Sequence, residues 1–228
     1  MTDNIATKMV IEQPVPIRKQ VYRHLRDQIL TYAIMPTSRL VEAKIAKELG
    51  ISRTPIREAL HLLEKDGFVE SIPRVGYIVK KLDRDELDEI FEIRLVIEKL
   101  VCTRAIEKAD NTVIRQLERN IAEAEVALEN NTPHLFLKYD EEFHEMLVKS
   151  AGSKLLFNLC QQLRRLMLRY RAASIRESPS IKNALEGHMR IVKCLKNKDA
   201  EGLQSELMAH LNYSKEDIRK QAKALFDQ

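Results

Sequence analysis

The chain has little of several residue types whose abundance would mark a special class of protein. It contains no Trp, six Gly and three Cys among 228 residues. Cys102, Cys160 and Cys194 are odd in number, far apart and in no metal-like pair, which excludes a disulfide framework and favours buried free thiols in a reducing compartment. No uncharged stretch is long enough to span a bilayer, and no secretory signal is evident at the start. These absences predict a cytoplasmic protein without a membrane partner.

Charge is distributed unevenly along the chain. Residues 1–80 hold 13 Lys and Arg against 9 Asp and Glu, an excess of +4, whereas residues 81–228 hold 25 of each. A basic first region is attracted to phosphates, and a neutral second region is not. The excess is modest enough to arise by chance, so charge alone only favours nucleic-acid binding.

Residues 16–80 have the pattern of a winged helix-turn-helix, preceded by a flexible lead-in at residues 1–15. Helices are expected over 16–34 and 42–49 and from Ser52 to Gly67, with Gly50 leaving the second helix at positive φ. Ser52 is expected to be the N-cap of the third helix. Two strands, over 68–72 and 76–79, are expected to flank a tip at 73–75. The residues expected to face the core are Val21, Leu25, Ile29, Leu30, Ile45, Leu49, Ile56, Leu60, Leu63 and Phe68.

Residues 83–228 show no strand alternation. Apolar residues recur there at intervals of three and four, which predicts an all-helical bundle after a linker at 80–82. The whole chain is therefore expected to be mostly α. The expected helices are 83–109, 112–130, 133–150, 153–174, 180–197 and 199–226. The expected caps are Asp83, Asn111, Thr132, Ser153 and Asp199.

The start of the third helix carries residues suited to reading DNA. Arg53 and Arg57 are four apart and lie on one side of the helix, and Arg can contact guanine O6 and N7 together. Thr54 can serve a phosphate or a thymine methyl group. Ser52 and the unpaired amides around it can hold a phosphate.

The wing tip adds two more candidate residues. Arg74 is expected to enter the minor groove, and Gly76 to let the backbone pass close to it. The alternative for the recognition helix is that Arg57 only forms a surface ion pair. The candidate partners of that pair are the carboxylates of Glu48, Glu58 and Glu64.

The run from Ser52 to Leu60, followed by Leu63-Glu64 and Gly67-Phe68-Val69, resembles the helix-turn-helix signature of GntR-type bacterial transcription regulators. The resemblance covers about residues 17–80. It implies that the residues matching Ser52, Arg53, Thr54 and Arg57 face DNA, and that those matching Arg74 and Gly76 approach the minor groove. In one departure, Ala43 stands where some members carry an Arg, which leaves Lys44 for a weaker phosphate contact.

Four residues of the second region suit a metal centre. Asp140 and His144 are four apart and project from one helix face, and His188 and His210 lie in helical segments with apolar neighbours. Three imidazoles and a carboxylate can bind a divalent metal with open positions for water or a ligand. Zinc, nickel and manganese all suit this set. The alternative is that each is a hydrogen-bonded core residue.

The segment Phe91-Glu92-Ile93-Arg94, with Glu98 and the four candidate ligands, is similar to the FCD ligand-binding domain of the FadR branch over about residues 85–220. The resemblance implies a metal held by one Asp and three His, with a small carboxylate effector beside it and Arg94 lining the cavity. The alternative for Arg94 is an ion pair with Glu98, four residues on.

These features predict a metabolite-responsive transcription regulator of the bacterial cytoplasm, a repressor by the commoner arrangement in the family. A homodimer is expected to bind an inverted-repeat operator in double-stranded DNA. One alternative is a constitutive DNA-binding module with a purely structural metal. Another is a metal-dependent hydrolase, which the lack of an extra general base and of a Gly-rich phosphate cradle disfavours. We therefore expect no enzymatic activity.

Overall fold

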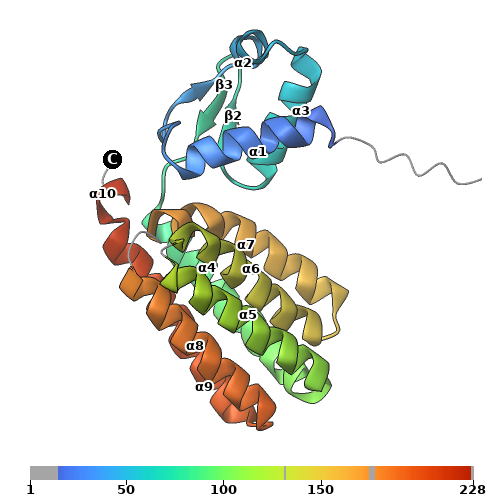
Figure 1. The fold of residues 1–228 in the computed structure, drawn as a ribbon. Helices are drawn as coiled ribbons and strands as arrows, with labels where there is room; N and C mark the ends of the chain where they lie inside the picture. Colours follow the sequence, from blue (N-terminus) through green and yellow to red (C-terminus); the bar gives the residue numbers. More distant parts are fainter. Residues whose placement is uncertain (1–14, 131, 175–177, 227–228) are drawn as a thin grey trace, which may run out of the picture. The chain divides into compact units, whose positions relative to one another are not determined.

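The computed structural model describes residues 15–130, 132–174 and 178–226. The chain divides into two compact units, Met1–Val79 and Lys80–Gln228 (Figure 1). The predicted order, a winged helix-turn-helix followed by an all-helical bundle, is confirmed.

The N-terminal unit combines three helices with a small antiparallel sheet. Its elements are α1 (Ile17–Leu30), β1 (Arg39–Leu40), α2 (Glu42–Leu49), α3 (Arg53–Lys65), β2 (Val69–Ile72) and β3 (Gly76–Val79). The strand order is β1-β3-β2. The β2 and β3 strands form the predicted wing, in register from Val69 opposite Val79 to Ile72 opposite Gly76.

The core of this unit lies between α1 and α3, which pack against each other. Val21, Leu25 and Ile29 project from one side of α1 at intervals of four, and Leu60 and its neighbours on α3 are fully buried. Each such side chain contributes about 1.5–3 kcal/mol when it leaves water. The hydrophobic period therefore fixes which side of α3 faces inward.

Two expectations for this unit are wrong in detail, and one strand was not predicted. The first helix ends at Leu30 and not at residue 34, because the chain turns at Tyr32, where φ is 60°. Leu49 was expected in the core but is 41% exposed, and Ala46 is buried in its place. Strand β1 was not predicted, because two residues are too few to show alternation.

The C-terminal unit is a bundle of long helices (Figure 1). Its elements are α4 (Arg84–Lys108), α5 (Asn111–Glu129), α6 (Pro133–Ser150), α7 (Lys154–Ser174), α8 (Ser178–Lys196), α9 (Ala200–Gln221) and α10 (Lys223–Phe226). Sequential neighbours α5 and α6 pack together, as do α8 and α9, while α4 packs against α6, α7 and α9.

The predicted caps are confirmed in part. Asp83 accepts a bond from the Glu86 amide, and Asp199 and Ser153 likewise accept from amides in the first turn that follows each of them. Two predicted caps are wrong. Asp110 and not Asn111 caps α5, and the Thr132 hydroxyl donates backward to the Ala127 carbonyl, with no capping bond to α6. The last helix is interrupted at Ala222, and α10 begins at Lys223.

The segment that enters the bundle is held by α7. Arg169 donates from Nη1 to the Lys81 carbonyl oxygen at 2.9 Å and from Nη2 to Glu86 Oε2 at 2.8 Å. The Tyr170 hydroxyl donates to the same Glu86 oxygen. Burial alone would raise the pKa of Glu86, but the bonds from Tyr170 and Arg169 lower it below its ordinary value. The first turn of α4 is thus tied to the C-terminal half of α7.

Cys102 and Cys160 are buried and Cys194 is partly exposed, and all are free thiols. Burial raises the pKa of Cys102 to about 12 and that of Cys160 to about 11, so both stay protonated. Among the described residues, no helix combines the length and apolar character needed to cross a bilayer.

Two glycines of the N-terminal unit allow the cost of backbone strain to be measured apart from the cost of a steric clash. Gly50 and Gly76 both have positive φ, 65° and 111°. A Cβ on Gly50 would meet nothing within 4 Å, whereas one on Gly76 would lie 2.9 Å from the Leu40 carbonyl oxygen. We expect Gly50→Ala to lower the free energy of unfolding by about 1 kcal/mol and Gly76→Ala by about 2–4 kcal/mol. Urea unfolding followed by circular dichroism measures both. Equal losses would show that the contact with β1 does not constrain Gly76.

Candidate DNA-reading surface and candidate metal centre

The predicted reading residues gather at the N-terminal end of α3. Ser52, Arg53, Thr54 and Arg57 are all exposed, while the opposite side of the helix is buried. Ser52 has the extended backbone of an N-cap, but its hydroxyl makes no capping bond. The helix therefore presents two guanidiniums and two hydroxyl groups to solvent within its first turns.

Both guanidiniums are held by one carboxylate that sequence analysis did not single out. Arg57 donates from Nε to Glu42 Oε1 at 3.0 Å and from Nη2 to Oε2 at 3.0 Å, and Arg53 Nη2 lies 3.7 Å from the same Oε2. The bond from Arg57 lowers the pKa of Glu42. Arg57 thus forms an ion pair as its alternative supposed, but not with any of the three carboxylates proposed for it.

Sequence spacing could not reveal this pair, because Glu42 and Arg57 are 15 residues apart on different helices. The one local signal was an acidic residue in the first turn of α2, which suggests only a favourable interaction with the helix dipole. Arg53 and Arg57 remain 63% and 56% exposed, so a duplex can reach both side chains.

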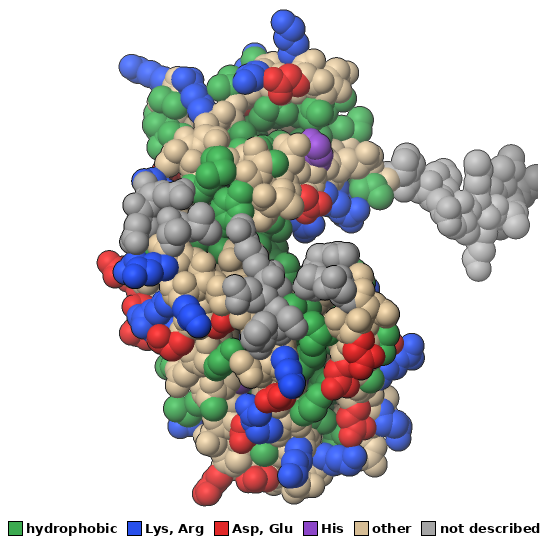
Figure 2. Space-filling model, turned by 60° about the vertical axis from the view of Figure 1, so that its left-hand side comes forward, with side chains coloured by type: hydrophobic (Ala, Val, Ile, Leu, Met, Phe, Trp, Pro, Cys, Tyr) green, Lys and Arg blue, Asp and Glu red, His purple; other side chains and the backbone are tan. Residues whose placement is uncertain are grey.

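The wing tip is built around its two predicted residues. Arg74 is exposed and has φ of 63°, and Arg39 braces the tip by donating from Nε to the Val75 carbonyl. Gly76 lacks a side chain where β3 approaches the Leu40 carbonyl of β1, which gives it a structural reason beside the predicted approach to DNA. On the face drawn in Figure 2, Lys and Arg side chains project from the N-terminal unit, while acidic and basic side chains are interspersed over the bundle.

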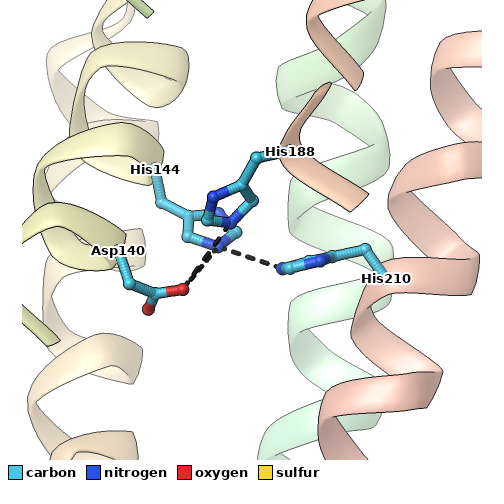
Figure 3. Close-up of side chains that lie close together, drawn as sticks. All are labelled: Asp140, His144, His188 and His210. Atoms are coloured by element: carbon cyan, nitrogen blue, oxygen red, sulfur yellow. Dashed lines mark hydrogen bonds and ion pairs between the residues drawn. The ribbon is translucent and has the colours of Figure 1, made fainter. Parts of the chain in front are cut away.

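The four predicted metal ligands converge inside the bundle (Figure 3). Asp140 and His144 come from α6, His188 from α8 and His210 from α9, and their ligand atoms all lie within 4.8 Å of one another. Asp140 Oδ1 is 3.6 Å from His188 Nε2 and 3.9 Å from His144 Nε2, and His144 Nε2 is 3.3 Å from His210 Nε2. Ligands about 2.0–2.1 Å from one ion stand roughly 3–4 Å apart, so these spacings fit a metal.

Burial keeps the three imidazoles neutral. His144, His188 and His210 are at most 4% exposed. Burial lowers the pKa of each, that of His188 to about 4 against the opposing pull of Asp140, and those of the other two well below the usual value. A neutral ring keeps the lone pair that a metal requires.

Three polar atoms of the cluster are buried without hydrogen bonds. Asp140 Oδ1, His144 Nδ1 and His188 Nε2 make no hydrogen bond among the described residues, although Asp140 Oδ1 forms an ion pair with Arg171 Nη2 at 2.8 Å. Most buried polar atoms in folded proteins have a hydrogen-bond partner, and a metal would satisfy His188 Nε2, which has none and lies among the other ligand atoms. The residues therefore fit a divalent cation.

Two neighbours position these ligands and were not predicted. Phe143 stacks on His188 with ring centroids 3.8 Å apart and planes 11° apart. Gly187 makes room for His210, because a Cβ there would lie 2.7 Å from His210 Nδ1. A glycine within a helix and next to a candidate ligand was the only signal for this close approach.

A pocket opens beside the cluster, with about 440 Å³ of empty space including its open part. Three guanidiniums line it, those of Arg94, Arg164 and Arg171, together with Asp140, His144 and His210. Arg171 Nη2 lies 2.8 Å from Asp140 Oδ1 and Nη1 donates to Ser214 at 3.0 Å. Arg94 is buried, lines the pocket and also donates to Glu98 at 2.7 Å, so the alternative proposed for Arg94 is present as well.

Arg164 and Arg171 were not predicted. They are seven residues apart and so share a face of α7, a spacing that could have indicated a common role. Because Leu, Met and Tyr surround them in the sequence, the segment was interpreted only as part of the hydrophobic core.

Comparison with known proteins decides the family. The FCD domain model matches residues 89–213, more than half of the chain, and the model of bacterial regulatory proteins of the gntR family matches residues 17–79. The chain belongs to the GntR family and carries an FCD domain. This chain is 31% identical over 210 residues to the HTH-type transcriptional regulator YdhC of Bacillus subtilis. The alignment covers 92% of this chain and 94% of that protein.

Other relatives agree with this assignment. The HTH-type transcriptional repressor RspR of Escherichia coli is 28% identical, with 90% of each chain covered. The solved structure of E. coli McbR/YncC aligns with a TM-score of 0.75 at 23% identity, covering 91% of this chain and 99% of that one, and so supports the fold alone. This GntR protein is a DNA-binding transcription regulator, and the hydrolase alternative is wrong because its families and relatives are regulators.

Glu42 offers a test of the reading surface, because it neutralises both arginines while no DNA is present. We expect Glu42→Gln to raise affinity for DNA of any sequence. In the variant, Arg53 and Arg57 do not have to break an ion pair with a carboxylate before they contact a phosphate or a base. Arg57→Ala should have the opposite effect. Fluorescence anisotropy with a selected operator and a random duplex, over a series of salt concentrations, measures both.

The matched control is Glu58→Gln, because Glu58 is an exposed acid of α3 that pairs with Arg18 and not with Arg53 or Arg57. An equal gain in affinity from Glu42→Gln and Glu58→Gln would reduce the effect to net charge and remove the special role of Glu42.

Metal retention tests the cluster. We expect His188→Ala to weaken binding of zinc by at least about 100-fold, since ligand substitutions cost more than the 10- to 100-fold typical of supporting residues. Gly187→Ala should weaken it by about 10- to 100-fold, through displacement of His210. Elemental analysis and competition with a chelator measure both. His61→Ala, on the exposed side of α3, is the control, and an equal loss there would contradict the assignment.

Proposed function

We propose that this regulator responds to a small organic acid, with residues 16–80 reading DNA and residues 83–228 sensing the acid. In the proposal Asp140, His144, His188 and His210 hold a divalent metal, either zinc, nickel or manganese. A carboxylate effector completes its coordination beside Arg94. Ser52, Arg53, Thr54, Arg57, Arg74 and Gly76 meet the operator.

One observation carries the proposal, which is that three guanidiniums and a fitting metal cluster line the same pocket. The carboxylates of Asp140 and Glu141 at its wall do not balance three guanidiniums and a divalent ion. An anion is therefore the ligand that this wall favours, because a bidentate bond from Arg to a carboxylate is strong where water is partly excluded.

The chain's own residues would hold the acid in a defined orientation. The fork of Arg94 is fixed by its bond to Glu98, and Arg171 is fixed between Asp140 and Ser214. The metal would supply Lewis-acid coordination to a carboxylate oxygen. Because the ligands come from α6, α8 and α9, binding of the acid would favour one arrangement of these helices over others.

Two copies are proposed to bind an inverted-repeat operator as a homodimer in the bacterial cytoplasm, with repression as the direction of control. A change in helix arrangement alters operator affinity only as far as the acid binds one state more tightly than the other. Relatives in the family are named repressors, which supports this direction.

The competing proposal is a constitutive DNA-binding protein with a structural metal. A closed four-ligand site favours that function. The pocket favours the sensor, since its wall is shared by two imidazoles and Asp140. Chelation that unfolds the bundle, with no acid altering operator affinity, would establish the structural metal.

The sensor is tested by a thermal-shift screen of mono- and dicarboxylates on metal-loaded protein, followed by operator binding with each acid that stabilises it. We expect Arg94→Met to weaken binding of such an acid by about 10- to 100-fold, since a hydrogen bond to a charged group contributes about 1.5–3 kcal/mol. Metal content should be unchanged. Calorimetric titration measures the affinity.

Arg119→Met, on the exposed surface of α5, is the control and should bind the acid normally. Unaltered acid binding in Arg94→Met would remove Arg94 from the effector site. Absence of any stabilising acid, together with operator affinity insensitive to all of them, would contradict the sensor as a whole.

A further inference from the structure

The middle of α4 exposes an apolar row that nothing in the chain covers among the described residues. Ile93, Val96 and Leu100 are 48%, 73% and 42% exposed. Their spacing of three and four places them on one face, opposite the buried face of the same helix. Single exposed apolar residues are common, but a row of three along one helix is the pattern of a packing surface.

Charged residues extend this row at both ends, with opposite signs. Glu89 lies one turn before Ile93 and Arg104 one turn after Leu100, and both are exposed. At 100° per residue, positions 89, 93, 96, 100 and 104 fall within an arc of roughly 80°. We call these five residues the α4 face. Glu107 stands beyond it, in the last turn of the helix.

The two charges cannot satisfy each other within one chain. Fifteen residues of helix separate Glu89 from Arg104, which is about 22 Å along the axis. No ion pair reaches either residue in the part of the chain that the structure describes. Both are solvent-exposed, so a second molecule can supply an oppositely charged partner to each.

A second copy of the same helix supplies both partners. Glu89 and Arg104 are equally far from the Val96-Ile97 peptide, and so are Ile93 and Leu100. A two-fold axis through that peptide, with the helices antiparallel, sets Glu89 opposite Arg104 of the second copy and Ile93 opposite its Leu100. Such an isologous contact is self-complementary in shape and in charge. Parallel helices would instead set like charges together.

The neighbouring helix α7 exposes two further apolar side chains next to α4. Its C-terminal half bonds to Glu86 at the start of α4, and a Cβ on Gly152, just before α7, would lie 2.9 Å from Lys108 Nζ at the end of α4. The two helices are therefore antiparallel, and Leu155 and Leu159 lie beside the C-terminal half of α4. They are 70% and 36% exposed.

We infer that the α4 face is the surface through which two copies of this chain form their homodimer, with the two α4 helices antiparallel about Val96. The inference rests on the homodimer of the proposed function and assigns its interface. It places the symmetry axis of the assembly on the helix that carries Arg94 on its buried side.

Sedimentation equilibrium of the full-length variants tests the surface. Val96→Glu should raise the dimer dissociation constant by at least about 100-fold, since it buries like charges at the axis. Glu89→Arg and Arg104→Glu should each raise it by about 10-fold or more, and the double variant should restore it to within about threefold of the original. Circular dichroism checks that each variant is folded.

Val126→Glu is the matched control, because Val126 is 53% exposed on α5. A dimer that dissociates with Val126→Glu and not with Val96→Glu overturns the α4 face but leaves the homodimer. Failure of the double variant to recover overturns the antiparallel arrangement. A monomeric original protein overturns both the surface and the homodimer, whatever its affinity for DNA.

Discussion

Four ionisable groups buried together are the constraint on which the C-terminal unit depends. Asp140 and three imidazoles come from three helices, and a buried polar atom without a partner costs about 1–3 kcal/mol. Arg171 supplies one positive charge at 2.8 Å from Asp140, and burial holds the imidazoles neutral. A divalent cation bound by these residues would satisfy their unpaired polar atoms together. The packing of α6, α8 and α9 would then depend on whether the metal site is occupied.

In the N-terminal unit, by contrast, the paired charges lie at the surface. Its arginines pair with Glu42 at the surface, where water and salt weaken the interaction. Such a pair is readily exchanged for contacts with a duplex. A buried cluster resists change and an exposed pair allows it, so one chain contains both a stable buried cluster and a readily exchanged surface ion pair.

Periodicity explains why much of the fold could be predicted from the sequence. The core of α3 and the i, i+4 pair Asp140 and His144 follow from local spacing, and so does the turn at Gly50. Contacts between distant helices leave no local signal. Glu42 with Arg57, the guanidiniums of α7 and the room that Gly187 leaves for His210 arise from tertiary packing, and sequence analysis missed each of them.

Helix α7 carries two sets of contacts on one continuous rod. Arg164 and Arg171 line the pocket, while Arg169 and Tyr170, adjacent to Arg171, hold Lys81 and Glu86 where the chain leaves the DNA-reading unit. Arg169, Tyr170 and Arg171 belong to one helix, so a rotation or axial shift of α7 would displace all of them together. A ligand bound at Arg171 would therefore lie less than one helical turn from the two residues that hold Lys81 and Glu86.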